Sequence, residues 1–158
     1  MPPGAAGTAG QPIRMGIAQG PYWSMIHTVR LMNRHNVDMT VLPIHEIAHN
    51  FQRPSWNFEP EALAVLKTHY FLERTNTSIV IPHRDFVIRG GAGYRYYMRN
   101  HGAGTISYNE AMRRGIYSAY MLGYNLTGIA NRIGWEPFRQ TFRAFEELHH
   151  TQAASQEG

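Results

Sequence analysis

Two histidines four residues apart, with a glutamate directly after the first, most constrain what this chain can fold into. They are His45, Glu46 and His49, in the segment His45-Glu46-Ile47-Ala48-His49. In an α-helix, residues four apart lie one turn above each other on the same face, so both imidazoles would point at one place. A glutamate beside the first histidine can reach a water there without binding the metal itself. The pattern therefore predicts a helix that presents two zinc ligands and a general base to a cleft.

The residues around this motif favour a helix with one apolar side. Pro43 suits a first helical position, where its missing N–H costs nothing, and 53–55 (Arg-Pro-Ser) is expected to end the helix. The arc opposite the histidines, which we expect to face the core, carries Ile44, Ile47, Ala48 and Phe51. The alternative is a metal-free histidine pair that is held by other hydrogen bonds.

Composition restricts how such a metal can be held. The chain has no cysteine, so zinc would have to be bound by histidine and carboxylate side chains. With 158 residues, of which 43 % are hydrophobic, the chain is long enough for one domain with a real core. We expect a flexible leader at 1–12, a catalytic domain at 13–150 and a flexible tail at 151–158.

The formal net charge of +4 is scattered along the chain rather than gathered in runs. This balance is typical of a solvated basic surface and does not predict a nucleic-acid partner. The alternative is a base-stacking surface at 94–99, where tyrosines alternate with arginines. No stretch approaches the roughly 20 apolar residues that cross a bilayer, so no membrane partner is expected. The N-terminus lacks a signal-peptide pattern, and the residues leave localisation and oligomeric state open.

Hydrophobic periodicity and helix breakers predict a mainly α (α+β) fold with a small sheet. Besides the motif helix, helices are expected at 22–35, at 60–74, from 107 or 109 to 133, and from 135 onward. The helix at 60–74 is apolar on both sides and should be packed on both. The last helix should turn Phe138, Phe142 and Phe145 inward. Short strands are expected at 13–19, 78–82 and 86–88, and a loop or hinge at 90–93. The long helix should bury a stripe of Leu122, Leu126, Ile129 and Ile133, opposite Tyr117, Tyr120 and Tyr124.

A catalytic zinc takes three protein ligands and keeps a fourth position for water. The metzincin continuation is excluded, because Gln52 and Ser55 stand where it requires glycine and histidine. A glutamate from a second helix remains, and the spacing of thermolysin-like motifs would place it at His69. We expect Glu61, which follows His49 by twelve residues, enough for a turn and the start of an antiparallel helix. The alternatives are Glu59, His69 and Glu73.

This ligand set predicts a hydrolytic mechanism. Zinc held by His45, His49 and Glu61 would lower the pKa of its water toward roughly 7. Glu46 would take the proton as the hydroxide attacks a carbonyl and later pass it to the leaving amine. Tyr120 and Tyr124 are the expected donors of a hydrogen bond to the oxyanion; the alternative is that both are core residues.

Two segments of the chain resemble the M60-like, or enhancin-type, metallopeptidases. The run His45-Glu46-Ile47-Ala48-His49-Asn50-Phe51-Gln52, then Trp56, then Glu61-Ala62-Leu63-Ala64 is similar to their H-E-x-G-H-x-x-Q, tryptophan and glutamate-helix pattern. Gly134-Trp135-Glu136-Pro137-Phe138-Arg139-Gln140-Thr141-Phe142 is similar to the G-W-E-x-F-x-x-x-F segment that closes the family's domain. The similarity covers about residues 40–148. It departs at Ala48, where the family has glycine, and at 61–63, where it often has Glu-Val-Thr.

The resemblance implies a gluzincin-like fold and a secreted zinc endopeptidase that often acts on mucin-like or O-glycosylated proteins. The chain would be a minimal catalytic unit, without the family's large N-terminal portion and carbohydrate-binding modules. The substrate is therefore expected to be a protein or glycoprotein. The alternative function is a non-catalytic, zinc-stabilised module that binds a protein or glycan, which would have no need of Glu46.

Overall fold

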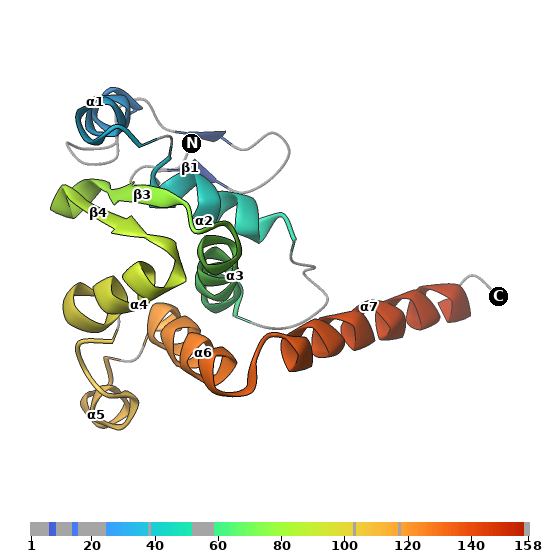
Figure 1. Ribbon diagram of the computed structural model, residues 1–158. Helices are drawn as coiled ribbons and strands as arrows, with labels where there is room; N and C mark the ends of the chain where they lie inside the picture. Colours follow the sequence, from blue (N-terminus) through green and yellow to red (C-terminus); the bar gives the residue numbers. More distant parts are fainter. Residues whose placement is uncertain are drawn as a thin grey trace.

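The computed structural model describes residues 7–8, 14–15, 25–37, 39–51, 59–102, 104–116 and 118–156 (Figure 1). The helices are α1 (Met25–His35), α2 (Val41–His49), α3 (Pro60–Thr75), α4 (Gly90–His101), α5 (Tyr108–Arg114), α6 (Ala119–Ile133) and α7 (Glu136–Gln156). Strand β1 (Gly7–Thr8) pairs antiparallel with β2 (Arg14–Met15), and β3 (Ser78–Ile81) with β4 (Phe86–Arg89). The chain is mostly helical with little sheet, so the predicted mainly α class is confirmed.

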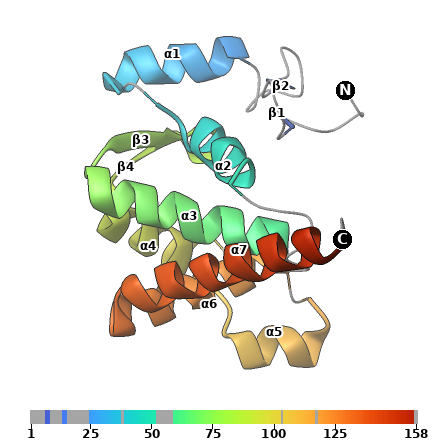
Figure 2. The ribbon, with the colours of Figure 1, turned by 90° about the vertical axis from the view of Figure 1, so that its right-hand side faces the viewer.

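Helix α3 lies at the centre and packs against α2, α4 and α6 (Figures 1 and 2). The helix begins at Pro60, where the carboxylate of Glu59 accepts a hydrogen bond from the backbone N–H of Glu61 at 3.4 Å. It ends at Asn76, whose φ of 51° places it in the left-handed region. Its buried residues, which lie on every side of the helix, are Ala62, Leu63, Ala64, Val65, Leu66, Thr68, His69 and Leu72. The predicted packing on both sides is confirmed.

The β3–β4 hairpin covers one end of α3 and adds three isoleucines, Ile79, Ile81 and Ile88, to the main core. Its register pairs Ser78 with Arg89 and Ile81 with Phe86, so the strands predicted at 78–82 and 86–88 are confirmed. A parallel bridge between Thr40 and Val80 joins β3 to the residue just before α2. The hairpin therefore fixes where the motif helix begins.

The predicted loop at 90–93 is wrong, because these residues form the first turn of α4. At Gly91 a Cβ atom would lie 2.7 Å from Cβ of Glu73 on α3. The glycine is required there because two helices approach closely, not because the chain is flexible. Farther along α4, Tyr94 and Tyr97 are buried. They pack into the main core, which leaves only part of segment 94–99 at the surface.

The predicted long helix from 107 or 109 to 133 is also wrong, because the chain breaks it into α5 and α6. Gly115 ends α5 with a φ of +66°, and Ser118 then caps α6 by accepting a hydrogen bond from the N–H of Met121. The predicted core stripe is right in part: Leu126 packs against a core cluster, but Ile129 and Ile133 are exposed. The buried residues of α6 are Met121, Gly123, Thr127 and Ala130.

Several predicted boundaries move. Helix α1 begins at Met25 rather than at 22, and Pro43 is the third residue of α2 rather than the first. Helix α7 continues through Gln156, into the segment from 151 for which a flexible tail is predicted. Gly7–Thr8, in the predicted leader, forms a strand pair with part of the strand predicted at 13–19. The remaining leader residues, the predicted helix end at 53–55 and Tyr117 lie outside the described residues.

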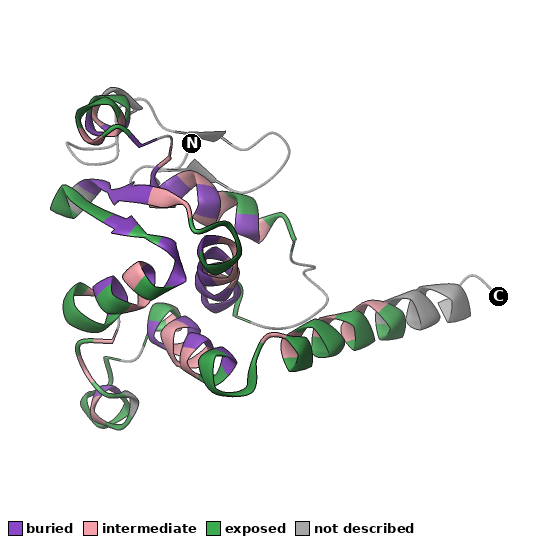
Figure 3. Cartoon of the chain, viewed as in Figure 1, coloured by how far each residue is buried: buried purple, intermediate pink, exposed green. Residues whose placement is uncertain are grey.

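Burial is concentrated where α2, α3, α4 and the hairpin meet, whereas α7 extends away from this body and is largely exposed (Figure 3). As predicted, the phenylalanines at 138 and 142 pack inward, against Leu63 and Leu66 of α3. Within the described part of the chain, no helix is both long and apolar enough to span a bilayer.

Candidate metal centre

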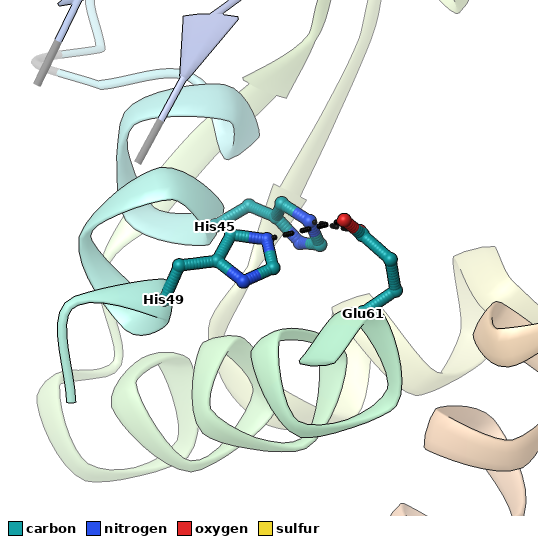
Figure 4. A group of neighbouring side chains, drawn as sticks. All are labelled: His45, His49 and Glu61. Carbon is teal, nitrogen blue, oxygen red and sulfur yellow. Dashed lines mark hydrogen bonds and ion pairs between the residues drawn. The ribbon is translucent and has the colours of Figure 1, made fainter. Parts of the chain in front are cut away.

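The two motif histidines and Glu61 point toward one another from neighbouring helices (Figure 4). His45 and His49 lie one turn apart on α2, and Glu61 lies in the first turn of α3. Nε2 of His45 is 2.9 Å from Oε2 of Glu61, and Nε2 of His49 is 3.4 Å from Oε1 of the same carboxylate. One ligand atom from each residue lies within 4.8 Å of the other two. The structure therefore brings together the three residues that the sequence analysis selected.

This donor set fits a zinc ion. Ligand atoms held at about 2.1 Å on a tetrahedral zinc lie roughly 3.4 Å from one another. The distance from His49 to Oε1 of Glu61, 3.4 Å, equals that spacing, and the distance from His45 to the other oxygen, Oε2, is shorter at 2.9 Å. Imidazole nitrogen and carboxylate oxygen are also ligands that zinc takes in catalytic sites. The three residues therefore fit a zinc ion by their chemistry and by their proximity.

Exposure differs between the two sides of the centre. The side chains of His45 and His49 are each 12 % exposed, while that of Glu61 is 39 % exposed. Hydrogen bonds with His45 and then His49 hold the pKa of Glu61 well below its ordinary value, although burial acts in the opposite direction. Glu61 is therefore an anion at neutral pH, and the centre is open to solvent on its side.

Glu46 and Tyr120 lie beside this centre. The ring of Tyr120, at the start of α6, stacks on that of His45 with centroids 5.9 Å apart. The pKa of Tyr120 is raised to about 12, mainly by burial. The charge of Glu61, a hydrogen bond with Glu61 and the charge of Glu46 act in the same direction. Tyr120 consequently keeps its proton at neutral pH and can donate a hydrogen bond there.

Tyr124, the other predicted donor, is placed differently. Its ring packs against the main core and lies under Gly104, where a Cβ atom would come within 2.5 Å of it. Its ring thus has a packing role, which is the alternative stated above, and the prediction that its hydroxyl serves the centre stays a prediction. Tyr124 lies one helical turn after Tyr120 on α6. Tyr120, which is nearer the start of the helix, is the tyrosine that stacks on His45.

The alternative third ligands have other partners. Glu59 caps α3, while His69 and Glu73 belong to a second polar cluster farther along this helix. In that cluster, Nη1 of Arg95 lies 3.1 Å from Nε2 of His69 and 3.3 Å from Oε2 of Glu73. Arg95 also donates to Oδ1 of Asn131 at 2.6 Å.

The sequence analysis gave Arg95 and Asn131 no role in a polar site. Their positions on α4 and α6 carry no local motif, so no signal in the sequence could have joined them to His69.

Comparison with known proteins adds no assignment, because no family model, curated protein or solved structure matches this chain.

Proposed function

We propose that this protein is a zinc-dependent endopeptidase of the gluzincin type, with His45, His49 and Glu61 as the metal ligands. The observation that carries the proposal is the convergence of two Nε2 atoms and one carboxylate, at 2.9 and 3.4 Å, on a solvent-open side of the fold. A purely structural zinc site is closed by four protein ligands. Among the described residues, the metal-binding group consists of three.

A zinc ion bound by this set supplies Lewis-acid chemistry, because it polarises a peptide carbonyl and lowers the pKa of water to about 7. Glu46, directly after His45, would accept a proton from the attacking water and return it to the leaving amine. The hydroxyl of Tyr120 would donate a hydrogen bond to the oxygen that becomes negative as the carbonyl is attacked. Glu61 and the two histidines would hold the ion in place.

The resemblance of residues 40–148 to M60-like peptidases supports the same assignment from the sequence. It also points to the substrate class, namely extended segments of glycosylated, mucin-like proteins. This part of the proposal depends on the resemblance alone and is tested by comparing a mucin-type glycoprotein with its deglycosylated form as substrates.

The decisive experiment replaces the proposed base while keeping the proposed ligands. Glu46→Gln should bind zinc as the parent protein does and lose hydrolysis of an unfolded or glycosylated protein by at least about 100-fold. Glu147→Gln, the same change at an exposed position on α7, is the matched control and should retain activity. Metal content is measured by atomic spectroscopy and hydrolysis by release of new amino groups.

The same variants distinguish the alternative, a zinc-stabilised binding module without activity. In that case the parent protein would bind zinc but hydrolyse nothing, and Glu46→Gln would change neither property. Absence of zinc binding by the parent protein at micromolar zinc would reject both functions.

A further inference from the structure

The side of α2 that faces away from the histidines is only partly buried, as far as the described residues are concerned. Ile44 and Ala48 are buried, but Ile47 is 44 % exposed and Phe51 is 70 % exposed. The sequence pattern predicts that all four face the core, and for the last two this prediction is wrong. Ile47 and Phe51 thus present apolar side chains to solvent beside a groove.

These residues form one wall of a groove of about 550 Å³. Helix α3 supplies the floor with residues such as Leu66 and Tyr70, and α7 supplies the opposite wall with Phe138 and Phe142. The volume falls within the roughly 300–1,000 Å³ that is typical of small-molecule sites. Its lining is predominantly apolar, so the groove suits a ligand with an apolar body.

The charges of the groove have one sign. Among the described residues that line it, Lys67, Arg74 and Arg139 are basic and none is acidic. Glu136 pairs with Arg139 at 3.3 Å, and the charge of Glu146 acts on Lys67, but neither glutamate lines the groove. An anion bound in the groove beside one of these cations would therefore be favoured over a cationic group.

Lys67 is the cation best placed to receive such a group. Its Nζ donates to the backbone carbonyl of Phe51 and lies 5.7 Å from the centre of the Phe142 ring, so it spans the two walls. Burial lowers the pKa of Lys67 to about 8. An anionic ligand beside this partly buried ammonium would stabilise its charged form, and an ammonium has three N–H groups with which to donate.

We propose that the groove between α2, α3 and α7 binds a small amphipathic anion, such as a fatty acid. Its apolar body lies against Ile47, Phe51 and Phe142, and its carboxylate lies near Lys67 and Arg139. The ligand would occupy the face of α2 opposite the metal centre, so its binding does not depend on zinc or on peptidase activity.

The test uses three probes with the same alkyl chain and different head groups: dodecanoate, dodecanol and dodecyltrimethylammonium. Isothermal titration calorimetry of the full chain should detect binding of dodecanoate, with the alcohol at least about tenfold weaker and the cation weaker still. Equal affinity for all three would overturn the proposed anionic recognition.

Variants locate the site. Lys67→Met keeps an apolar side chain of similar length and should weaken dodecanoate about tenfold while leaving dodecanol unchanged. Phe51→Asp, an exposed position whose change leaves the core intact, should abolish binding of dodecanoate. Val29→Asp on α1, which is 46 % exposed, is the matched control and should leave binding unchanged.

An alternative occupant is a second copy of the chain. Sedimentation velocity of the ligand-free protein decides this point: a monomer supports the small-ligand proposal. A stable dimer that Phe51→Asp dissociates and Val29→Asp does not would overturn it.

Discussion

The ring of Tyr120 stacks on that of His45, with centroids 5.9 Å apart and planes inclined by 16°. This contact joins α6 to α2 across the open side of the metal centre. It places a protonated phenol next to a proposed zinc ligand, because the pKa of Tyr120 is raised to about 12. The ring and the hydroxyl thus have separable roles: the ring stacks on His45, and the hydroxyl, which hydrogen-bonds with Glu61, would turn to a substrate oxygen only when substrate is bound.

Tyr120→Phe separates these roles, because it keeps the ring and removes the hydroxyl. We expect zinc affinity and thermal stability close to those of the parent, with kcat lower by about 10²–10³ for the loss of an oxyanion donor. Steady-state kinetics with a fluorogenic peptide, together with a zinc titration, measure both quantities. Tyr124→Phe is the control, because its ring packs in the core. An unchanged kcat for Tyr120→Phe would exclude the donor role.

If His45, His49 and Glu61 bind zinc as proposed, removing the metal should lower stability by mass action. Zinc present at 100 times its dissociation constant stabilises the folded state by about 2.7 kcal/mol. Adding a chelator should therefore lower the melting temperature of the parent protein and leave that of Glu61→Ala unchanged, as measured by differential scanning calorimetry. His101→Ala, at an exposed position on α4, should respond to the chelator like the parent. Equal responses of Glu61→Ala and the parent would show that Glu61 is not a ligand.

The buried His69 should make the protein sensitive to mild acid. Burial and then the nearby charge of Arg95 lower its pKa from 6.5, although Glu73 and Asn131 act in the opposite direction. Its Nε2 lies 3.1 Å from Nη1 of Arg95 and 3.3 Å from Oε2 of Glu73, and burial favours the neutral ring. His69 is thus neutral in the folded protein and charged in the unfolded chain below pH 6.5.

The sign of the effect follows from this difference. Between the lowered pKa and 6.5 the unfolded chain binds more protons, so the free energy of unfolding falls as the pH is lowered through this range. One such group gives a slope of up to about 1.4 kcal/mol per pH unit. Urea titrations in chelator should show this slope for the parent and for His101→Gln. A His69→Gln variant that retains the same slope would disprove the assignment.

Two glycines of α6 should respond oppositely to alanine. At Gly123 a Cβ atom would lie 2.6 Å from Cβ of Val65 and 2.9 Å from the carbonyl oxygen of Ala62, both on α3. Overpacking of this kind costs about 1–3 kcal/mol, more than the roughly 1 kcal/mol that alanine gains in a helix. Gly123→Ala should therefore destabilise the protein.

Gly128 is the matched control on the same helix, because a Cβ atom added there would meet no heavy atom within 4 Å. Gly128→Ala should stabilise by up to about 1 kcal/mol. Chemical denaturation of both variants measures the two effects. A Gly123→Ala variant as stable as Gly128→Ala would show that α3 and α6 do not approach as closely as described.

The three candidate ligands could be predicted from the sequence because their arrangement depends mostly on local structure. Helical periodicity alone aligns His45 with His49. Pro60 and the cap residue Glu59 mark the start of the next helix, and this places Glu61 in its first turn. What the sequence could not supply was orientation between distant elements. Tyr120 and Tyr124 share one stripe of α6, and only the packing of α6 on α3 decides which of them reaches His45.

The wrong predictions of a loop at 90–93 and of one long helix to 133 also arise from contacts and backbone conformations that local patterns do not show. The glycines at 90–93 have the composition of a loop, but Gly91 serves a close helix contact that involves a partner 18 residues earlier, Glu73. The periodic pattern continues through Gly115, whose left-handed backbone nevertheless ends α5. The apolar pattern of α2 does not show that Ile47 and Phe51 border a groove rather than the core, because the other walls come from α3 and α7.

Because α3 is enclosed by α2, α4 and α6, it is the segment least able to open without global unfolding. In deuterated water its amide protons should be the last to exchange, whereas those of α7 exchange early. The helix that carries Glu61 would then keep its shape even while the periphery of the molecule fluctuates.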